Sequence, residues 1–238
     1  MLQEKTVFLT GAGSGIGKAT AKKLLALGAK VFSLECSAAN VAAARAELAE
    51  LGDQRLAFFE GDVRDETQVR DAFEACDRAF GPLDVLINNA GVGVPTPDLA
   101  VAETAVFERQ FDVNAKGVFF CMREALRRMR PRKSGHILTL ISMAGQRTNP
   151  GAPLYCASKF AARGLSGGLA DQVLQEGIKV TDVNPGPVDS NYWGDRQVPR
   201  EKFLRPDDVA EIIAFVLQLP DHVVVRAVDF DSIHWLAR

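Results

Sequence analysis

The sequence predicts an α/β protein built on a doubly wound parallel sheet, and its alternation of apolar runs with helical patterns carries this prediction. Short runs of apolar, largely β-branched residues alternate with longer stretches rich in Ala, Leu, Arg and Glu. Uninterrupted apolar strands between helices are typical of a parallel sheet covered on both faces. Right-handed crossovers then give three layers, with helices on both sides of the sheet.

The elements can be assigned in chain order. Seven strands are expected, over residues 6–9, 30–34, 56–59, 85–87, 136–141, 180–183 and 223–225. Helices are expected from residue 18, over 38–51, 66–79, 104–129 and 157–176, and near residues 206–208. No repeat, charge block or low-complexity linker interrupts the alternation, so one domain is expected over residues 1–238.

The composition excludes several classes of function. Of 238 residues, 47% are hydrophobic and the net charge is -2, which argues against a nucleic-acid module with its usual basic patch. No stretch approaches the roughly 20 apolar residues of a membrane span, and the start of the chain has no targeting pattern. The four scattered cysteines fit a reduced, cytoplasmic setting, and the three histidines form no spaced cluster for a metal.

A glycine-rich segment follows the first predicted strand. Residues 10–17 hold glycines at 11, 13, 15 and 17, and the next residues begin a helical pattern. Glycines allow a tight turn and let a pyrophosphate approach the backbone, while the helix N-terminus offers free N–H groups and partial positive charge. Because the pattern lies between a strand and a helix, it predicts a dinucleotide site, although a ligand-free turn is the alternative.

The second predicted strand ends at Glu35. An acid about 20 residues beyond such glycines can accept hydrogen bonds from the adenosine ribose, and the same carboxylate would repel a 2′-phosphate. No arginine that could bind that phosphate stands at position 36, which is a cysteine, or within the glycine segment at position 14, which is a serine. The sequence therefore favours NAD(H) over NADP(H), the alternative interpretation being an ordinary exposed glutamate at a strand end.

Tyr155 and Lys159 lie one helical turn apart, after Pro153. Positions i and i+4 share a helix face, so the phenol and the ammonium are expected side by side. A nearby cation lowers the pKa of a phenol from its usual value of about 10, which would make a general base near neutral pH. Alone, the pair would be a surface contact on an amphipathic helix.

Taken together, the motifs resemble the short-chain dehydrogenase/reductase family. They are the glycine segment 10–17, Asn88-Asn89-Ala90-Gly91, Asn114, Ser142, Tyr155-x-x-x-Lys159 and Asn184-Pro185-Gly186. The resemblance implies a Rossmann-type fold and an oxidoreductase that exchanges a hydride between a nicotinamide and an alcohol or carbonyl. It implies that Tyr155 is the acid/base, that Lys159 lowers its pKa, that Ser142 binds the substrate oxygen, and that Asn114 anchors a proton-relay water.

The resemblance also implies which residues border the cofactor. They are Gly11, Ser14, Ile16, Gly17, Glu35, Asp62, Val63, Asn89, Ala90, Gly91, Tyr155, Lys159, Pro185, Gly186, Val188 and Ser190. Ser190 stands where the family usually has a threonine. The chain also ends without the family's glycine-rich close, which leaves the role of residues 227–238 open.

The substrate is expected to be a small alcohol or carbonyl compound, selected by residues 143–150 and by a loop near 189–205, which is expected to be mobile. In that loop Tyr192 and Trp193 could cover an apolar substrate, or Trp193 could pack on the protein. Similar proteins are often homodimers or homotetramers, and neither nucleic acid nor membrane is expected as a partner. A non-catalytic NAD(H) sensor and an NADP(H)-dependent carbonyl reductase are the alternative functions.

Overall fold

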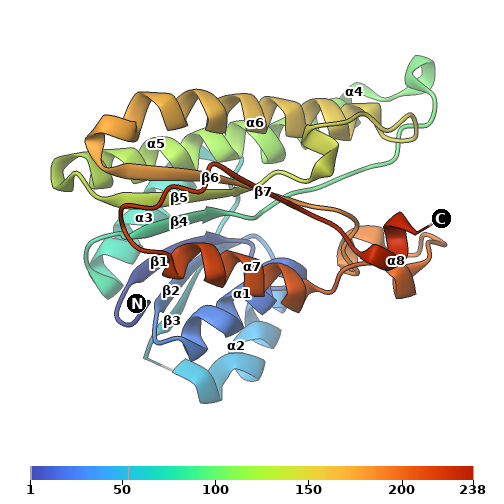
Figure 1. The fold of residues 1–238 in the computed structure, drawn as a ribbon. Helices are drawn as coiled ribbons and strands as arrows, with labels where there is room; N and C mark the ends of the chain where they lie inside the picture. The colour runs from blue at the N-terminus through green and yellow to red at the C-terminus, as the bar shows by residue number, and fades with distance from the viewer. Residues whose placement is uncertain (1, 53, 238) are drawn as a thin grey trace.

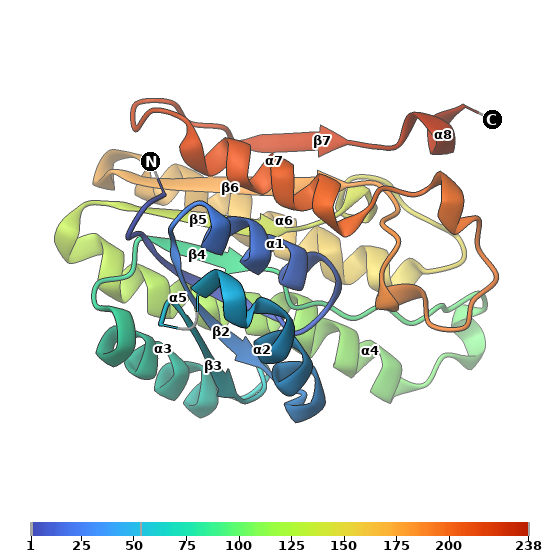
Figure 2. The same cartoon turned by 90° about the horizontal axis from the view of Figure 1, so that it is seen from below.

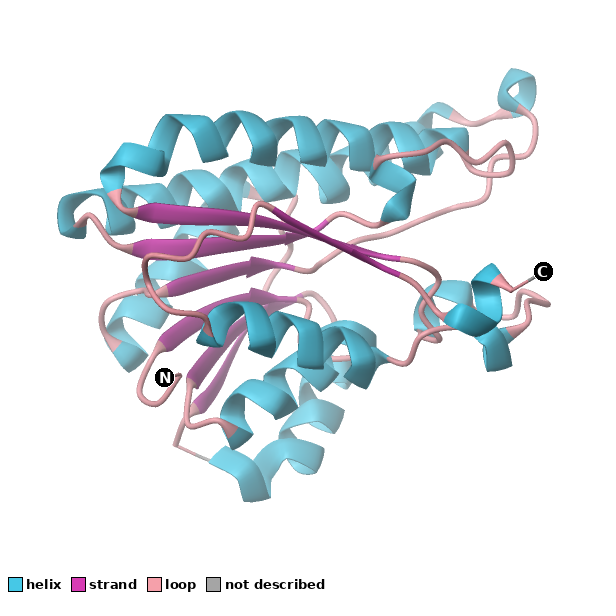
Figure 3. Cartoon of the chain, viewed as in Figure 1, coloured by secondary structure: helices cyan, strands magenta, loops and turns pink. Residues whose placement is uncertain are grey.

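The computed structural model describes residues 2–52 and 54–237 and contains one seven-stranded parallel sheet, with the strand order β3-β2-β1-β4-β5-β6-β7. The strands are β1 (Thr6–Thr10), β2 (Lys30–Glu35), β3 (Leu56–Glu60), β4 (Val85–Asn88), β5 (Gly135–Leu140), β6 (Ile178–Pro185) and β7 (Ala227–Phe230). All six neighbouring pairs are parallel, so the predicted doubly wound sheet is confirmed (Figure 3).

Helices cover both faces of the sheet, as Figures 1 and 2 show. One face carries α1 (Gly15–Ala26), α2 (Ala38–Gly52) and α7 (Pro206–Gln218). The other carries α3 (Glu66–Phe80), α5 (Val118–Met129) and α6 (Pro153–Val173), preceded by α4 (Thr104–Phe111). Each face has its own apolar core, which fits strands that are buried on both sides.

Shorter turns complete the chain. They are η1 (Leu99–Val101), η2 (Asp112–Gly117), η3 (Arg130–Arg132), η4 (Met143–Gly145), η5 (Leu174–Glu176), η6 (Asn191–Trp193), η7 (Arg200–Lys202) and the one-turn helix α8 (Ile233–Leu236). The predicted helix over 104–129 is therefore three segments, because η2 is a π-helical stretch between α4 and α5. No helix within residues 2–52 and 54–237 is long and apolar enough to traverse a bilayer.

The seventh strand lies later in the chain than predicted. The β-branched run Val223–Val225 is outside the sheet, and β7 is formed by Ala227–Phe230, which pairs with β6. A search for an apolar run placed the strand wrongly because β7 lies at the edge of the sheet, where its residues are only partly buried and need not be apolar. Backbone hydrogen bonds to β6 define this strand instead, beginning where the amide of Asp182 donates to the carbonyl of Arg226.

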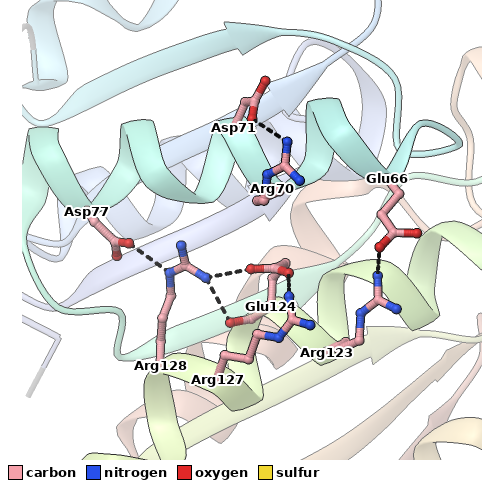
Figure 4. Close-up of polar contacts among 8 residues, drawn as sticks. All are labelled: Glu66, Arg70, Asp71, Asp77, Arg123, Glu124, Arg127 and Arg128. Atoms are coloured by element: carbon pink, nitrogen blue, oxygen red, sulfur yellow. Dashed lines mark hydrogen bonds and ion pairs between the residues drawn. The ribbon is translucent and has the colours of Figure 1, made fainter.

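A polar seam joins α3 to α5 on the outside of the second face (Figure 4). The buried carboxylate of Glu124 accepts hydrogen bonds from Arg127 and Arg128, and Arg128 also binds Asp77 of α3 at 2.8 Å. The Arg128 guanidinium lies 5.1 Å from the centre of the Phe73 ring. Through Arg128 this polar seam therefore links α5 to α3.

Candidate functional site

A cleft of about 1080 Å³ runs along the carboxyl ends of the strands. Its walls come from the segments that follow each of the seven strands, from the glycine loop after β1 to Asp231 after β7. The segments after β1 and β4 lead to helices on opposite faces of the sheet, so the cleft lies at the switch point of the topology. Open α/β sheets bind their ligands at this position.

The glycine loop is shaped to leave its backbone open to a ligand. Gly11 has a φ of 75°, which suits glycine, and a Cβ added to Gly17 would lie 1.9 Å from the carbonyl oxygen of Gly11. Ser14, the N-cap of α1, makes no side-chain hydrogen bond to the first turn. The first N–H groups of α1 therefore have no side-chain cap, and they face the cleft. Such groups can bind the pyrophosphate of a dinucleotide.

The loop after β4 is fastened to the glycine loop. The Thr10 hydroxyl accepts hydrogen bonds from the amides of Asn89 and Ala90, at 3.0 and 2.9 Å. The Asn89 side chain donates to the carbonyls of Thr10 and Gly11, at 2.8 and 3.1 Å. The side chain of Asn89 thus holds the loop together, while Ala90 and Gly91 line the cleft.

The adenosine end of the cleft is acidic. Glu35 is buried, and its carboxylate accepts hydrogen bonds from the amides of Gly13 and Ser37, at 2.9 and 3.1 Å. Asp62 lines the same end, where burial raises the pKa of its carboxyl but hydrogen bonds and charge from Arg64 bring the pKa below its usual value. Val63 also lines this end of the cleft.

Three of the predicted catalytic side chains come from neighbouring elements. Ser142 follows β5 and adopts a φ of 104°, and its hydroxyl accepts a hydrogen bond from the amide of Ala144 at 3.2 Å. Tyr155 and Lys159 come from the first turns of α6, which begins at Pro153 as predicted. The Ser142 hydroxyl lies close enough to Tyr155 to lower the pKa of its phenol.

Lys159 and Tyr155 differ in detail from the expected pair. The Lys159 ammonium donates to the carbonyl of Leu140 at 2.7 Å and lies 6.0 Å from the centre of the Tyr155 ring. Burial raises the pKa of Tyr155 above its ordinary value, and it lowers the pKa of Lys159 to about 8. The protein alone therefore does not produce the lowered tyrosine pKa that the helical spacing suggested.

Asn114 lies in the π-helical segment η2 and is buried. Its side-chain oxygen accepts from the Val92 amide at 2.9 Å, and its NH₂ group donates to the Val92 carbonyl and the Ser158 hydroxyl, at 2.7 and 2.9 Å. A Cβ on Gly91 would lie 3.4 Å from both the Asn114 oxygen and the Lys159 nitrogen. Asn114 thus holds the segment that lines the cleft beside Lys159.

The segment after β6 crosses from the sheet to the glycine loop. Pro185, Gly186, Val188 and Ser190 all line the cleft, and a Cβ on Gly15 would lie 3.3 Å from the Cβ of Ser190. The Ser190 hydroxyl caps the turn η6 by accepting from the Tyr192 amide. All the residues predicted to bind the cofactor therefore lie along one cleft.

Comparison with known proteins shows which family this chain belongs to. The family model of the short chain dehydrogenases matches residues 5–200. The chain belongs to the short-chain dehydrogenase family. An uncharacterized oxidoreductase of Staphylococcus saprophyticus is 33% identical over 231 residues, which cover 95% of this chain and 97% of that protein. This short-chain dehydrogenase is accordingly an oxidoreductase.

Solved structures share the fold over nearly the whole chain. The 3-ketoacyl-(acyl-carrier-protein) reductase of Brucella melitensis, complexed with NADH, has a TM-score of 0.90 at 28% identity and covers 98% of this chain and 99% of its own. The alcohol dehydrogenase of the archaeon Thermococcus sibiricus, complexed with 5-hydroxy-NADP, has a TM-score of 0.88 at 26% identity, with 97% of each chain covered. These two relatives of the short-chain dehydrogenase thus carry different cofactors, NADH in one and an NADP derivative in the other.

Sequence reasoning missed the part that the C-terminal segment plays in this short-chain dehydrogenase. Asp231, Trp235 and Leu236 line the cleft, and the Asp231 carboxylate packs where a Cβ of Gly186 would be. The one available signal was the departure from the family's glycine-rich close. Of the two alternatives for Trp193, covering a substrate or packing on the protein, the structure shows packing: its indole N–H donates to the Val188 carbonyl at 2.8 Å.

Proposed function

We propose that this oxidoreductase exchanges a hydride between NAD(H) and a secondary alcohol or ketone. The residues proposed to take part in catalysis are Tyr155, Lys159, Ser142 and Asn114. The observation that supports this most is the presence of a phenol, a hydroxyl and an ammonium in the cleft that also holds the glycine loop. Two separate sites for nucleotide and catalysis would not support hydride transfer, which needs both partners in contact.

The bound nicotinamide supplies or accepts the hydride. In reduction, Tyr155 donates its phenolic proton to the carbonyl oxygen, and the Ser142 hydroxyl donates a hydrogen bond to the same oxygen. A raised pKa keeps the phenol protonated at neutral pH, as a proton donor requires. In oxidation Tyr155 takes the alcohol proton and must first be deprotonated. The positive charges of Lys159 and of the oxidised cofactor would lower its pKa and favour that form.

The preference for NAD(H) rests on charge at the adenosine end of the cleft. The buried carboxylate of Glu35 faces the glycine loop and would repel a 2′-phosphate. Arg64 also lines this end, but its guanidinium donates two hydrogen bonds to Asp62, at 2.9 and 2.6 Å. A phosphate would have to compete with Asp62 for that cation.

Titration with NADH and NADPH, followed by nicotinamide fluorescence, tests the cofactor, and a screen of ketones tests catalysis. We expect NADH to bind roughly tenfold more tightly, a difference of about 1.4 kcal/mol. Tyr155→Phe should lower ketone reduction by about 10²–10⁴-fold while NADH binding is unchanged. Tighter NADPH binding would refute the cofactor preference, and full turnover in the variant would refute the role of Tyr155. NADH binding without turnover would indicate a sensor.

A further inference from the structure

A row of aromatic rings leads away from Tyr155, and all of its members except the buried Phe203 line the cleft. The ring of Tyr192 lies 5.5 Å from that of Tyr155, and Trp193 lies 5.2 Å from Tyr192. Phe203 follows at 5.0 Å from Trp193, and Trp235 of α8 at 5.4 Å from Phe203. Apart from Tyr155 of α6, these residues come from the 189–205 loop and from α8, which lie side by side at one end of the molecule (Figure 1).

Tyr192 is the member of this row that stands in front of the catalytic tyrosine. A Cβ on Gly93 would lie 2.2 Å from its hydroxyl oxygen and 2.5 Å from the nearest ring carbon, so the ring rests on the backbone of Gly93. Tyr192 thus bridges from Tyr155 to the segment that Asn114 holds. The two phenol groups are close enough to hydrogen-bond, so a substrate oxygen bound at Tyr155 would lie beside Tyr192.

The position of Tyr192 is held from outside the cleft. The Arg196 guanidinium lies 4.8 Å from the centre of the Tyr192 ring and 4.9 Å from that of Trp193. Arg196 also donates to the backbone carbonyls of both residues. Its charge is therefore engaged with the aromatic row.

Three further charged residues, Arg109, Arg147 and Asp231, line the cleft. Arg147 and Asp231 lie 3.9 Å apart, nitrogen to oxygen. The indole N–H of Trp193 is used by the Val188 carbonyl, so the cleft receives the indole ring and not its donor. Pro95, Pro150 and Leu236 line the same cleft. Beside Tyr155 and Ser142, this part of the cleft thus offers the aromatic rings of Tyr192, Trp193 and Trp235, with polar groups of residues 147–149 and Asn191 among them.

We propose that the substrate carries a planar, apolar group next to the reacting carbon, as in an aryl ketone or its secondary alcohol, and that Tyr192 determines this specificity. The inference rests on the proposed function for the identity of the reacting group. Aromatic pairs gain about 0.5–1.5 kcal/mol beyond the burial of their area, which corresponds to a preference of about two- to tenfold. A saturated ring of the same carbon skeleton buries similar area without that gain.

Binding measurements separate this inference from the proposed catalysis. The probe pair is acetophenone and cyclohexyl methyl ketone, titrated by calorimetry into the NADH complex of Tyr155→Phe, which keeps the ring and cannot donate the proton. We expect acetophenone to bind about two- to tenfold more tightly. Equal affinity, or binding of neither ketone, would overturn the inference, whereas wild-type protein that binds the aryl ketone without reducing it would overturn only the proposed function.

Variants assign the preference to Tyr192. In the same Tyr155→Phe background, Tyr192→Leu should reduce the ratio of the two affinities to about one, while Tyr192→Phe should keep it because the ring remains. Phe215→Leu, at an exposed position of α7, is the matched control and should leave the ratio unchanged. A ratio that persists in Tyr192→Leu, or that falls equally in the control, would show that Tyr192 does not determine the specificity.

Discussion

At Tyr155 the hydroxyl groups of three side chains influence one another. Burial raises the pKa of this phenol, the neighbouring Tyr192 adds to the rise, and Ser142 opposes it. Helical spacing could predict that Lys159 shares a helix face with Tyr155, because that relation is local. It could not predict Tyr192, which reaches the site from a loop distant in the sequence.

Removal of the Tyr192 hydroxyl should change the pH dependence of alcohol oxidation. The base form of Tyr155 is needed for this direction, so the rate rises as pH passes through its pKa. Because Tyr192 raises that pKa, Tyr192→Phe should shift the rising limb of kcat/KM to lower pH. The measurement is a pH profile for 1-phenylethanol with saturating NAD⁺. A shift toward higher pH would contradict the interaction between the two phenols.

Among the elements, prediction succeeds where burial and pattern coincide. The central strands are apolar on both faces and were found within a residue or two of their ends. The strand β7 was misplaced because its neighbour in the sheet, not its own composition, makes it a strand. The π-helical turn in η2 was not foreseen either; in the structure its Asn114 contacts Val92 and Ser158, which are distant in the sequence.

The seam between α3 and α5 gives a prediction about stability (Figure 4). Glu124→Gln removes the charge from a buried carboxylate that binds Arg127 and Arg128. Hydrogen bonds to charged groups contribute about 1.5–3 kcal/mol each, and the exposure of Arg127 reduces its share. We expect a loss of about 1–3 kcal/mol, measured as a lower urea midpoint.

The matched control for this seam is Glu74→Gln on α3. Glu74 and its partner Arg78 are both largely exposed, so that pair should contribute less than about 0.5 kcal/mol. Equal urea midpoints for the two variants would show that the buried seam adds nothing beyond an ordinary surface ion pair.

Across the whole molecule, the cleft is assembled from the carboxyl end of every strand. The half with the glycine loop could be predicted from sequence, since the glycines directly follow the first strand, Glu35 ends the second, and both belong to a local pattern. On the opposite side of the cleft, the sequence pointed to the 189–205 loop but not to residues 231–236, because their meeting joins segments that no local pattern links. In the structure this meeting is the contact between Phe203 and Trp235.

A chain that ends after Ser232 should lose part of the substrate site and keep the nucleotide site. Without Trp235 that side of the cleft is shorter, and we expect the KM for acetophenone to rise about two- to tenfold. The Kd for NADH should stay within about twofold by the same scale. A chain that ends after Leu236 keeps Trp235 and is the control. Equal effects of the two truncations on KM would contradict the role given to α8.

The backbone at Ser142 has a consequence for how this protein can change. Its φ of 104° and ψ of 154° lie in a region that is essentially reserved for glycine and costs about 1–3 kcal/mol for other residues. A glycine would relieve that strain, but its greater freedom in the unfolded chain would cancel about 0.4–1 kcal/mol of the gain. It would also lose the hydrogen bond from the Ala144 amide to the hydroxyl, a capping contact that contributes about 0.5–2 kcal/mol. The gain and the losses are of similar size, so stability alone does not account for serine at position 142, whereas the role proposed for its hydroxyl would.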